Sequence, residues 1–107
     1  MGENSKTLDS QPDFWAKRYK RNEHIVSRAI VGETLLVPIK GHLADMRRIF
    51  ALNPVADYVW EKLDGDTVID QIAAAIFEDF EVSKNEADSD LVELLEELIA
   101  AELVVEV

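Results

Sequence analysis

Three short runs of strand-forming residues, separated by turn signals, occupy the first half of the chain. The runs are HIVSRAIV at 24–31, TLLVPI at 34–39 and MRRIFAL at 46–52. Gly32, between the first two runs, can adopt the positive φ that a tight hairpin requires. Pro38 cannot donate to a ladder, so it suits a strand end or an unpaired side. The pattern predicts three antiparallel strands in a meander.

Helical periodicity replaces this pattern after residue 52. Asn53-Pro54 combines a good N-cap with a residue suited to the first helical position, and Ser83-x-x-Glu86 forms a capping box. The expected helices run from Asn53 to Gly65, from the cap Thr67 to Phe80, and from Ser83 to about Ala101. Residues 103–107, LVVEV, follow as a short β-prone tail. The sequence therefore predicts an α+β domain, a three-stranded antiparallel sheet followed by three helices.

The third predicted helix carries a wider apolar arc than one partner surface needs. Ala87, Leu91, Leu94 and Leu98 form a stripe that we expect in the core. Val92, Leu95 and Ile99 widen the arc to about 180°, whereas a helix with one partner needs an arc nearer 100°. The extra flank predicts either further packing or a binding groove. In the second case Leu94 lies in the core and Leu95 lines the groove.

Both faces of the third predicted strand are apolar. Ile49 and Ala51 point one way, and Phe50 and Leu52 point the other. In a simple meander this strand lies at an edge, where its backbone groups could accept an added strand. An apolar edge beside the wide arc of the third helix would form a slot for an extended peptide.

Composition and charge narrow the function classes. At 107 residues the chain is one domain, with 1–22 expected as a flexible N-terminal tail and 23–107 as the folded part. Residues 1–53 carry 9 Lys and Arg against 6 Asp and Glu, whereas residues 54–107 carry 2 against 16. Such an acidic helical half repels a phosphate backbone, so we expect no nucleic-acid partner. The absence of an apolar span and of a signal-like N-terminus predicts a cytoplasmic protein with no membrane partner.

Catalytic and metal-binding patterns are weak. The chain has no cysteine and only two histidines, His24 and His42, in different predicted segments. His42 and Asp45 share a polar turn, which favours a loop over a metal site. No phosphate-binding glycine loop or hydrolase motif occurs. We therefore expect a non-enzyme with no catalytic residue, no metal and no cofactor.

The sequence resembles the PqqD family, also called the RiPP recognition element, over about residues 25–105. The similarity is carried by L-N-x-x-A-x-x-x-W-x-x-L-D-G from Leu52 to Gly65, by the following Thr67-Val68, and by D-L-x-x-L-L-x-x-L before Leu103. The chain departs from the family at two places. Lys62-Leu63-Asp64-Gly65 lacks the cysteine usual in members dedicated to pyrroloquinoline quinone biosynthesis, and Glu102 replaces a common glycine.

The resemblance implies a winged helix-turn-helix-like fold and a peptide-binding function. Family members bind the leader segment of a ribosomally made precursor peptide as a strand beside the third strand. They present it to a modifying enzyme, often a radical SAM maturase. For this chain, the resemblance implies two sets of peptide-binding residues. On the strand they are Arg47, Arg48, Ile49, Phe50, Ala51 and Leu52, and on the helix Leu91, Val92, Leu95 and Ile99. The product would be the quinone cofactor or another peptide-derived compound.

A second function class stays open from the sequence. A winged-helix regulator or a protein–protein interaction scaffold without a leader peptide would have the same architecture. Pairing of two exposed strand edges would give a homodimer under either hypothesis, and otherwise the protein is a monomer.

Overall fold

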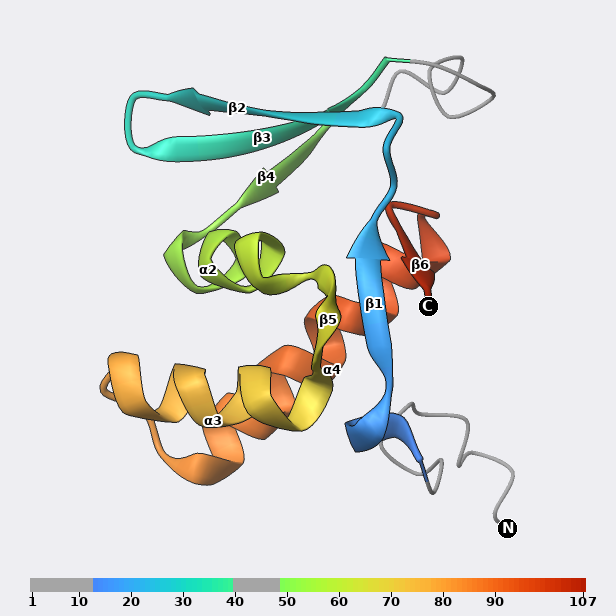
Figure 1. Cartoon of the computed structure of the whole chain (residues 1–107). Helices are drawn as coiled ribbons and strands as arrows, with labels where there is room; N and C mark the ends of the chain where they lie inside the picture. The colour runs from blue at the N-terminus through green and yellow to red at the C-terminus, as the bar shows by residue number, and fades with distance from the viewer. Residues whose placement is uncertain (1–12, 40–48) are drawn as a thin grey trace, which may run out of the picture.

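The computed structural model describes residues 13–39 and 49–107, which form two three-stranded antiparallel sheets and three α-helices (Figure 1). The elements in chain order are η3 (Phe14–Ala16), β1 (Arg18–Arg21), β2 (Ile25–Ile30), β3 (Glu33–Pro38), β4 (Phe50–Leu52), α2 (Pro54–Lys62), β5 (Asp64–Val68), α3 (Ile69–Asp79), α4 (Lys84–Ala100) and β6 (Val104–Glu106). The α+β class predicted from the sequence is confirmed. No helix in the described part of the chain is long and apolar enough to cross a membrane.

The predicted meander is confirmed as the sheet β2-β3-β4. β2 and β3 pair from Ile25↔Pro38 to Ile30↔Glu33, and Gly32 takes a positive φ of 76° in their turn. β4 pairs with β3 with Ala51 opposite Leu35, which leaves β4 at the edge of the sheet. Residues 40–48, including the start of the third predicted strand, lie outside the described residues.

The N-cap predicted at Asn53 is confirmed. The Asn53 side chain accepts a hydrogen bond from the Ala56 amide at 2.8 Å, and Pro54 begins α2. This cap turns the chain from the edge strand into the first helix within one residue. β4 and α2 are therefore held in a fixed relation by local chemistry.

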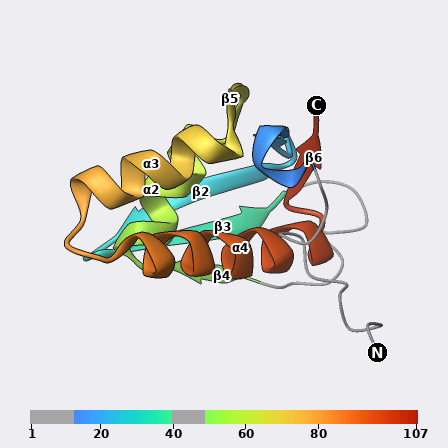
Figure 2. The same ribbon diagram turned by 90° about the horizontal axis from the view of Figure 1, so that it is seen from below.

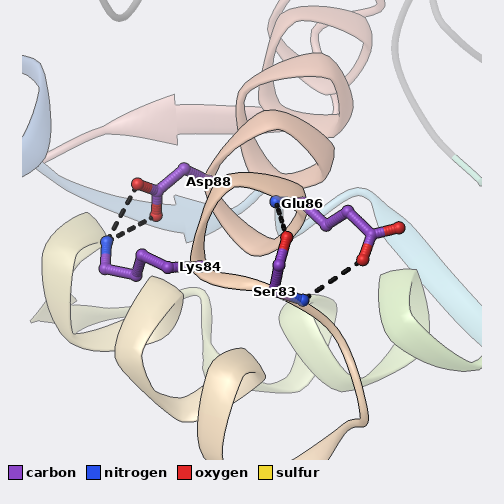
Figure 3. A network of polar contacts seen from close by, with 4 residues as sticks. All are labelled: Ser83, Lys84, Glu86 and Asp88. Carbon is purple, nitrogen blue, oxygen red and sulfur yellow. Dashed lines mark hydrogen bonds and ion pairs between the residues drawn. The ribbon is translucent and has the colours of Figure 1, made fainter.

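The capping box at the start of α4 is also confirmed (Figure 3). Ser83 Oγ accepts from the Glu86 amide at 3.0 Å, and Glu86 Oε1 accepts from the Ser83 amide at 3.2 Å. Lys84 Nζ donates to both carboxylate oxygens of Asp88 at 2.9 Å, one turn along the helix. These contacts fix the first turn of the longest helix.

A second sheet, β5-β1-β6, was missed by the sequence prediction of a flexible tail at 1–22. β1 is its central strand, with Tyr19 opposite Glu106 and Lys20 opposite Asp64. Phe14 and Tyr19 are buried in the core. Residues 13–22 therefore belong to the folded domain because they bury two aromatic side chains and bridge two distant segments, whereas residues 1–12 lie outside the described part.

The link between the first two helices also differs from the prediction. α2 ends at Lys62, and Asp64–Val68 forms β5 instead of a helix end and a Thr67 cap. The Asp64 carboxylate accepts from the amides of Asp66 and Thr67, each at 2.9 Å, and these bonds lower the Asp64 pKa. Gly65 has a positive φ of 86°, and β1 pairs with the segment. The turn and the neighbouring strand together override the helical pattern.

Buried side chains from the three helices and from both sheets form one core (Figures 1 and 2). In Figure 1 the β2-β3-β4 sheet lies above α2, and β1 runs beside the helices. α4 packs against α2, α3 and β6. The largest fully buried side chains are Phe14, Leu36, Val59, Leu63, Ile69, Ile72, Ile76, Leu91, Leu95, Leu98 and Leu103. α4 is thus covered on more than one side, which matters for the site.

Candidate functional site

A groove runs between β4, the start of α2 and the outer face of α4. It consists of two neighbouring hollows that share Glu97. The first, of about 310 Å³, is lined by Asn53, Val55, Ala56, Asp90, Glu93, Leu94 and Glu97, and the second by Phe50, Glu97, Ala100 and Ala101. Phe50 of β4 and Glu97, near the end of α4, line the same hollow. The groove therefore joins the sheet edge to the last helix.

β4 supplies the sheet side of this groove. Among the described strands only β3 pairs with β4, so β4 is an edge strand within the described part of the sheet. Ile49 is 60% exposed just before the strand, Ala51 is exposed, Phe50 is half-buried and Leu52 is buried. Strand edges of this kind can accept the backbone of an additional extended chain.

α4 supplies the helix side, but with other residues than the sequence predicted. Leu91, Val92 and Leu95 are buried in the core, and Leu95 is fully inaccessible at 0% exposure. Leu94, expected in the core, is half-buried and lines the groove. The prediction reversed Leu94 and Leu95. α4 packs against α2, α3 and β6, and these contacts bury most of its wide apolar arc.

The remaining predicted residues divide into two groups. Ile99 is half-buried and packs against the core. Arg47 and Arg48, together with His42 and Asp45, lie outside the described residues. Among the described residues of the predicted site, Phe50 lines the groove, and Ile49 and Ala51 are exposed on the same strand edge.

Most of the groove lining was not predicted from the sequence. Val55 and Ala56 at the start of α2, and Ala100 and Ala101 at the end of α4, are small residues that leave space between the elements. A signal was present for the carboxylates, because positions 90, 93 and 97 share one helical face. The sequence predicts that the acids of this helix, among them Asp88 and Glu96, flank the peptide slot and favour a basic or neutral ligand.

The electrostatics of the groove are acidic. Asp90, Glu93 and Glu97 are exposed along its α4 rim, and none of them forms an ion pair within the described residues. The described lining residues include no Lys, Arg or His. The groove therefore presents negative charge around a small apolar floor.

A hydrogen bond between Tyr58 and Asp79, outside the groove, joins two helices. The Tyr58 hydroxyl of α2 donates to the Asp79 carboxylate of α3, and this bond raises the pKa of Tyr58 to about 12. Within residues 13–39 and 49–107, no three His, Asp or Glu side chains gather where they could hold a metal ion.

Comparisons with known proteins agree with this geometry. Residues 33–104 match the family model described as coenzyme PQQ synthesis protein D (PqqD). A solved structure, "TbiB1 in Complex with the TbiA(beta) Leader Peptide", is similar with a TM-score of 0.65 and 25% sequence identity, covering 79% of this chain and 93% of that one. No curated protein matches.

The family match starts at β3 and ends at the first residue of β6, so it includes β4, all three helices and the groove between β4 and α4. It spans well over half of the 107 residues. The resemblance inferred from the Leu52–Gly65 segment and the α4 pattern is confirmed, and the chain belongs to the PqqD family.

Proposed function

We propose that this protein binds the leader segment of a ribosomally made precursor peptide. The leader adds as an extended strand to the edge of β4 and lies in the groove facing α4. The observation that carries the proposal is the edge strand beside the groove, both of which lie within the residues of the family match. The solved structure of TbiB1, which contains a leader peptide, supports the same kind of ligand.

The contacts proposed for the peptide follow the described geometry. Residues 49–52 provide the backbone edge and one wall, with Ile49 and Ala51 exposed beside it. Leu94, Glu97 and Ala100 provide the opposite wall on α4. The buried face of α4 holds the helix against the core through Leu91, Val92 and Leu95. Arg47 and Arg48 precede the edge strand, and we propose that they contact the incoming peptide's end.

The protein acts in this proposal as a non-catalytic adaptor. The carboxylates of the groove are exposed on its rim, and we assign them to binding. The adaptor would present the bound peptide to a modifying enzyme, for which a radical SAM maturase in the cytoplasm is our proposal. The product would be pyrroloquinoline quinone or another peptide-derived compound.

The proposal is tested by titrating the ¹⁵N-labelled protein with the leader of the precursor peptide encoded beside its gene. We expect amide shifts concentrated at residues 49–52 and along 93–101. Slowed hydrogen exchange at β4 amides would report strand addition. Shifts confined to another surface, or none at a saturating peptide concentration, would overturn the proposal.

A matched pair of variants sharpens the test. Ala100→Arg places a long side chain in the groove, and Ala74→Arg places the same side chain on the exposed face of α3. We expect the first variant to weaken leader binding at least tenfold and the second to change it less than twofold. Circular dichroism shows whether each variant remains folded, and equal loss in both would argue against the groove.

A further inference from the structure

We infer that the groove selects an extended segment with Lys or Arg side chains at alternate positions facing α4. This inference rests on the proposed function, since it specifies the chemistry of the chain that occupies the β4 edge. The groove is the site, and its three rim carboxylates determine which side chains it accepts. The occupant is thus a basic, strand-forming stretch of peptide.

The spacing of the carboxylates matches the repeat of a strand. An α-helix rises about 1.5 Å per residue, so Glu93 and Glu97 are separated by about 6 Å along the axis of α4. Side chains on one face of an extended chain repeat every two residues, or about 6.7 Å. A strand added to β4, with α4 alongside, can therefore place two consecutive inward side chains near Glu93 and Glu97. Asp90 extends the same rim by a further turn.

The floor of the groove favours long basic side chains over short ones. Val55, Ala56 and Leu94 line the first hollow, and Phe50 and Ala100 the second. The aliphatic stem of Lys or Arg can cover this apolar surface while its charged end reaches the exposed carboxylates. A Glu or Asp at the same positions would meet like charges with no described base in the lining to offset them.

The rim carboxylates are available to a ligand. The ion pairs resolved among the described residues are Lys84–Asp88 at the start of α4 and Lys17–Glu106 in the β1-β6 pair. Neither involves Asp90, Glu93 or Glu97. The formal net charge of −11 adds a long-range attraction for a basic chain.

Three designed peptides test the inference: C-terminally amidated Thr-Val-Xaa-Leu-Xaa-Val-Thr-Gly in which both Xaa are Lys, Gln or Glu, with the label on the N-terminal amine. Each is fluorescein-labelled, and binding is followed by anisotropy at low salt. We expect the Lys peptide to bind about threefold to tenfold more tightly than the Gln peptide, with the Glu peptide weakest. The preference should shrink at high salt, because exposed charges are screened.

The variant Asp90→Asn/Glu93→Gln/Glu97→Gln should remove most of the preference for Lys over Gln. The control Glu61→Gln/Glu78→Gln/Glu81→Gln changes the net charge equally at exposed positions outside the groove lining and should keep the preference. Equal loss in both triple variants would show that only net charge matters and would overturn the site.

The two proposals fail in different ways. Equal binding of the three peptides, with shifts at residues 49–52, would overturn the charge selection and leave strand addition standing. Failure of all three to perturb the groove would overturn the charge inference, while the natural leader independently decides the proposed function. An acidic natural leader that binds in the groove would also overturn the selection.

Discussion

The two sheets are built from different kinds of contact. β2-β3-β4 is a local meander whose strands follow one another closely in the chain, and its edge strands are largely exposed. β5-β1-β6 joins three distant segments, with Arg18 opposite Val68 and Tyr19 opposite Glu106. The first sheet leaves exposed edges, whereas the second ties the two ends of the domain together.

The bonds that surround β1 support this division. Arg21 Nη1 donates to the carbonyl oxygens of Trp60 at 2.8 Å and Glu61 at 3.0 Å, at the end of α2. The Asn22 amide donates to the Leu103 carbonyl at 2.9 Å. β1 therefore connects α2 and the C-terminal strand, and through them it supports the frame that holds the groove.

The largest expected effect comes from a buried charge in β1. Tyr19→Asp should cost about 4 kcal/mol or more of unfolding free energy, because it removes a buried aromatic ring and introduces an unpaired carboxylate into the core. Val26→Asp, in the exposed β2 strand, should cost about 1 kcal/mol or less. Urea denaturation measures both, and equal losses would contradict the contrast between the sheets.

The next largest effect separates the two sides of α4. Leu95→Ala should lower the unfolding free energy by about 2–5 kcal/mol, since Leu95 is fully buried. Leu94→Ala should cost about 1 kcal/mol, because the side chain is only half-buried.

Leader binding should respond differently in the two α4 variants. Leu94 lines the groove, so its loss should weaken binding at a temperature where both variants are folded. Leu95→Ala should leave binding nearly unchanged under the same conditions. A larger loss of stability in Leu94→Ala would restore the arrangement expected from the sequence.

The local part of the fold could be predicted from the sequence for a physical reason. Local signals act on backbone groups within a few residues, so the neighbouring sequence is enough to predict their effect. Examples are Gly32, Asn53 and the Ser83–Glu86 box. β1 could not be predicted in this way. Its sequence, RYKR, is mostly charged, and the partners that make it a strand are distant in the chain.

The candidate site was half predictable for a related reason. The position of β4 at an edge follows from the order of a meander, and it was confirmed. A helical wheel gives the angular order of Leu94 and Leu95, but it does not show which part of the arc faces solvent. That depends on how α2, α3 and β6 surround α4, which only the assembled fold determines.

A smaller effect is expected at the turn of the local sheet. Val31 is fully exposed, with a positive φ of 23° that a β-branched side chain disfavours. Val31→Asn creates Asn-Gly, the pair preferred in tight hairpin turns, and should raise the unfolding free energy by about 0.5–1 kcal/mol. Val31→Thr keeps the branch and serves as the control. If Val31→Asn does not raise the urea midpoint, the positive φ of Val31 does not strain the backbone.

The smallest effect concerns the hydrogen bond that Tyr58 of α2 donates to Asp79 of α3. α2 adjoins β4, and α3 adjoins β5. Asp79→Asn should lower the pKa of Tyr58 from about 12 towards its ordinary 10.0, because the hydrogen bond to the carboxylate is the largest cause of the rise. Glu78→Gln removes only the weaker charge effect of Glu78 on the Tyr58 phenolate and should lower the Tyr58 pKa less. Ring-carbon NMR resolves Tyr58 from Tyr19, whose pKa is also raised, mainly by burial.

The sign of the pH dependence follows from the same bond. The folded protein holds the Tyr58 proton more tightly than the unfolded chain, so this contribution to stability is complete below pH 10. It is lost as the pH rises through about 12. The Asp79→Asn variant should therefore lose less stability than the parent between neutral pH and pH 12, although its stability at neutral pH is slightly lower. An unchanged Tyr58 titration would mean that the two helices are joined by packing alone, and the link between the two halves of the domain would then lie in the core.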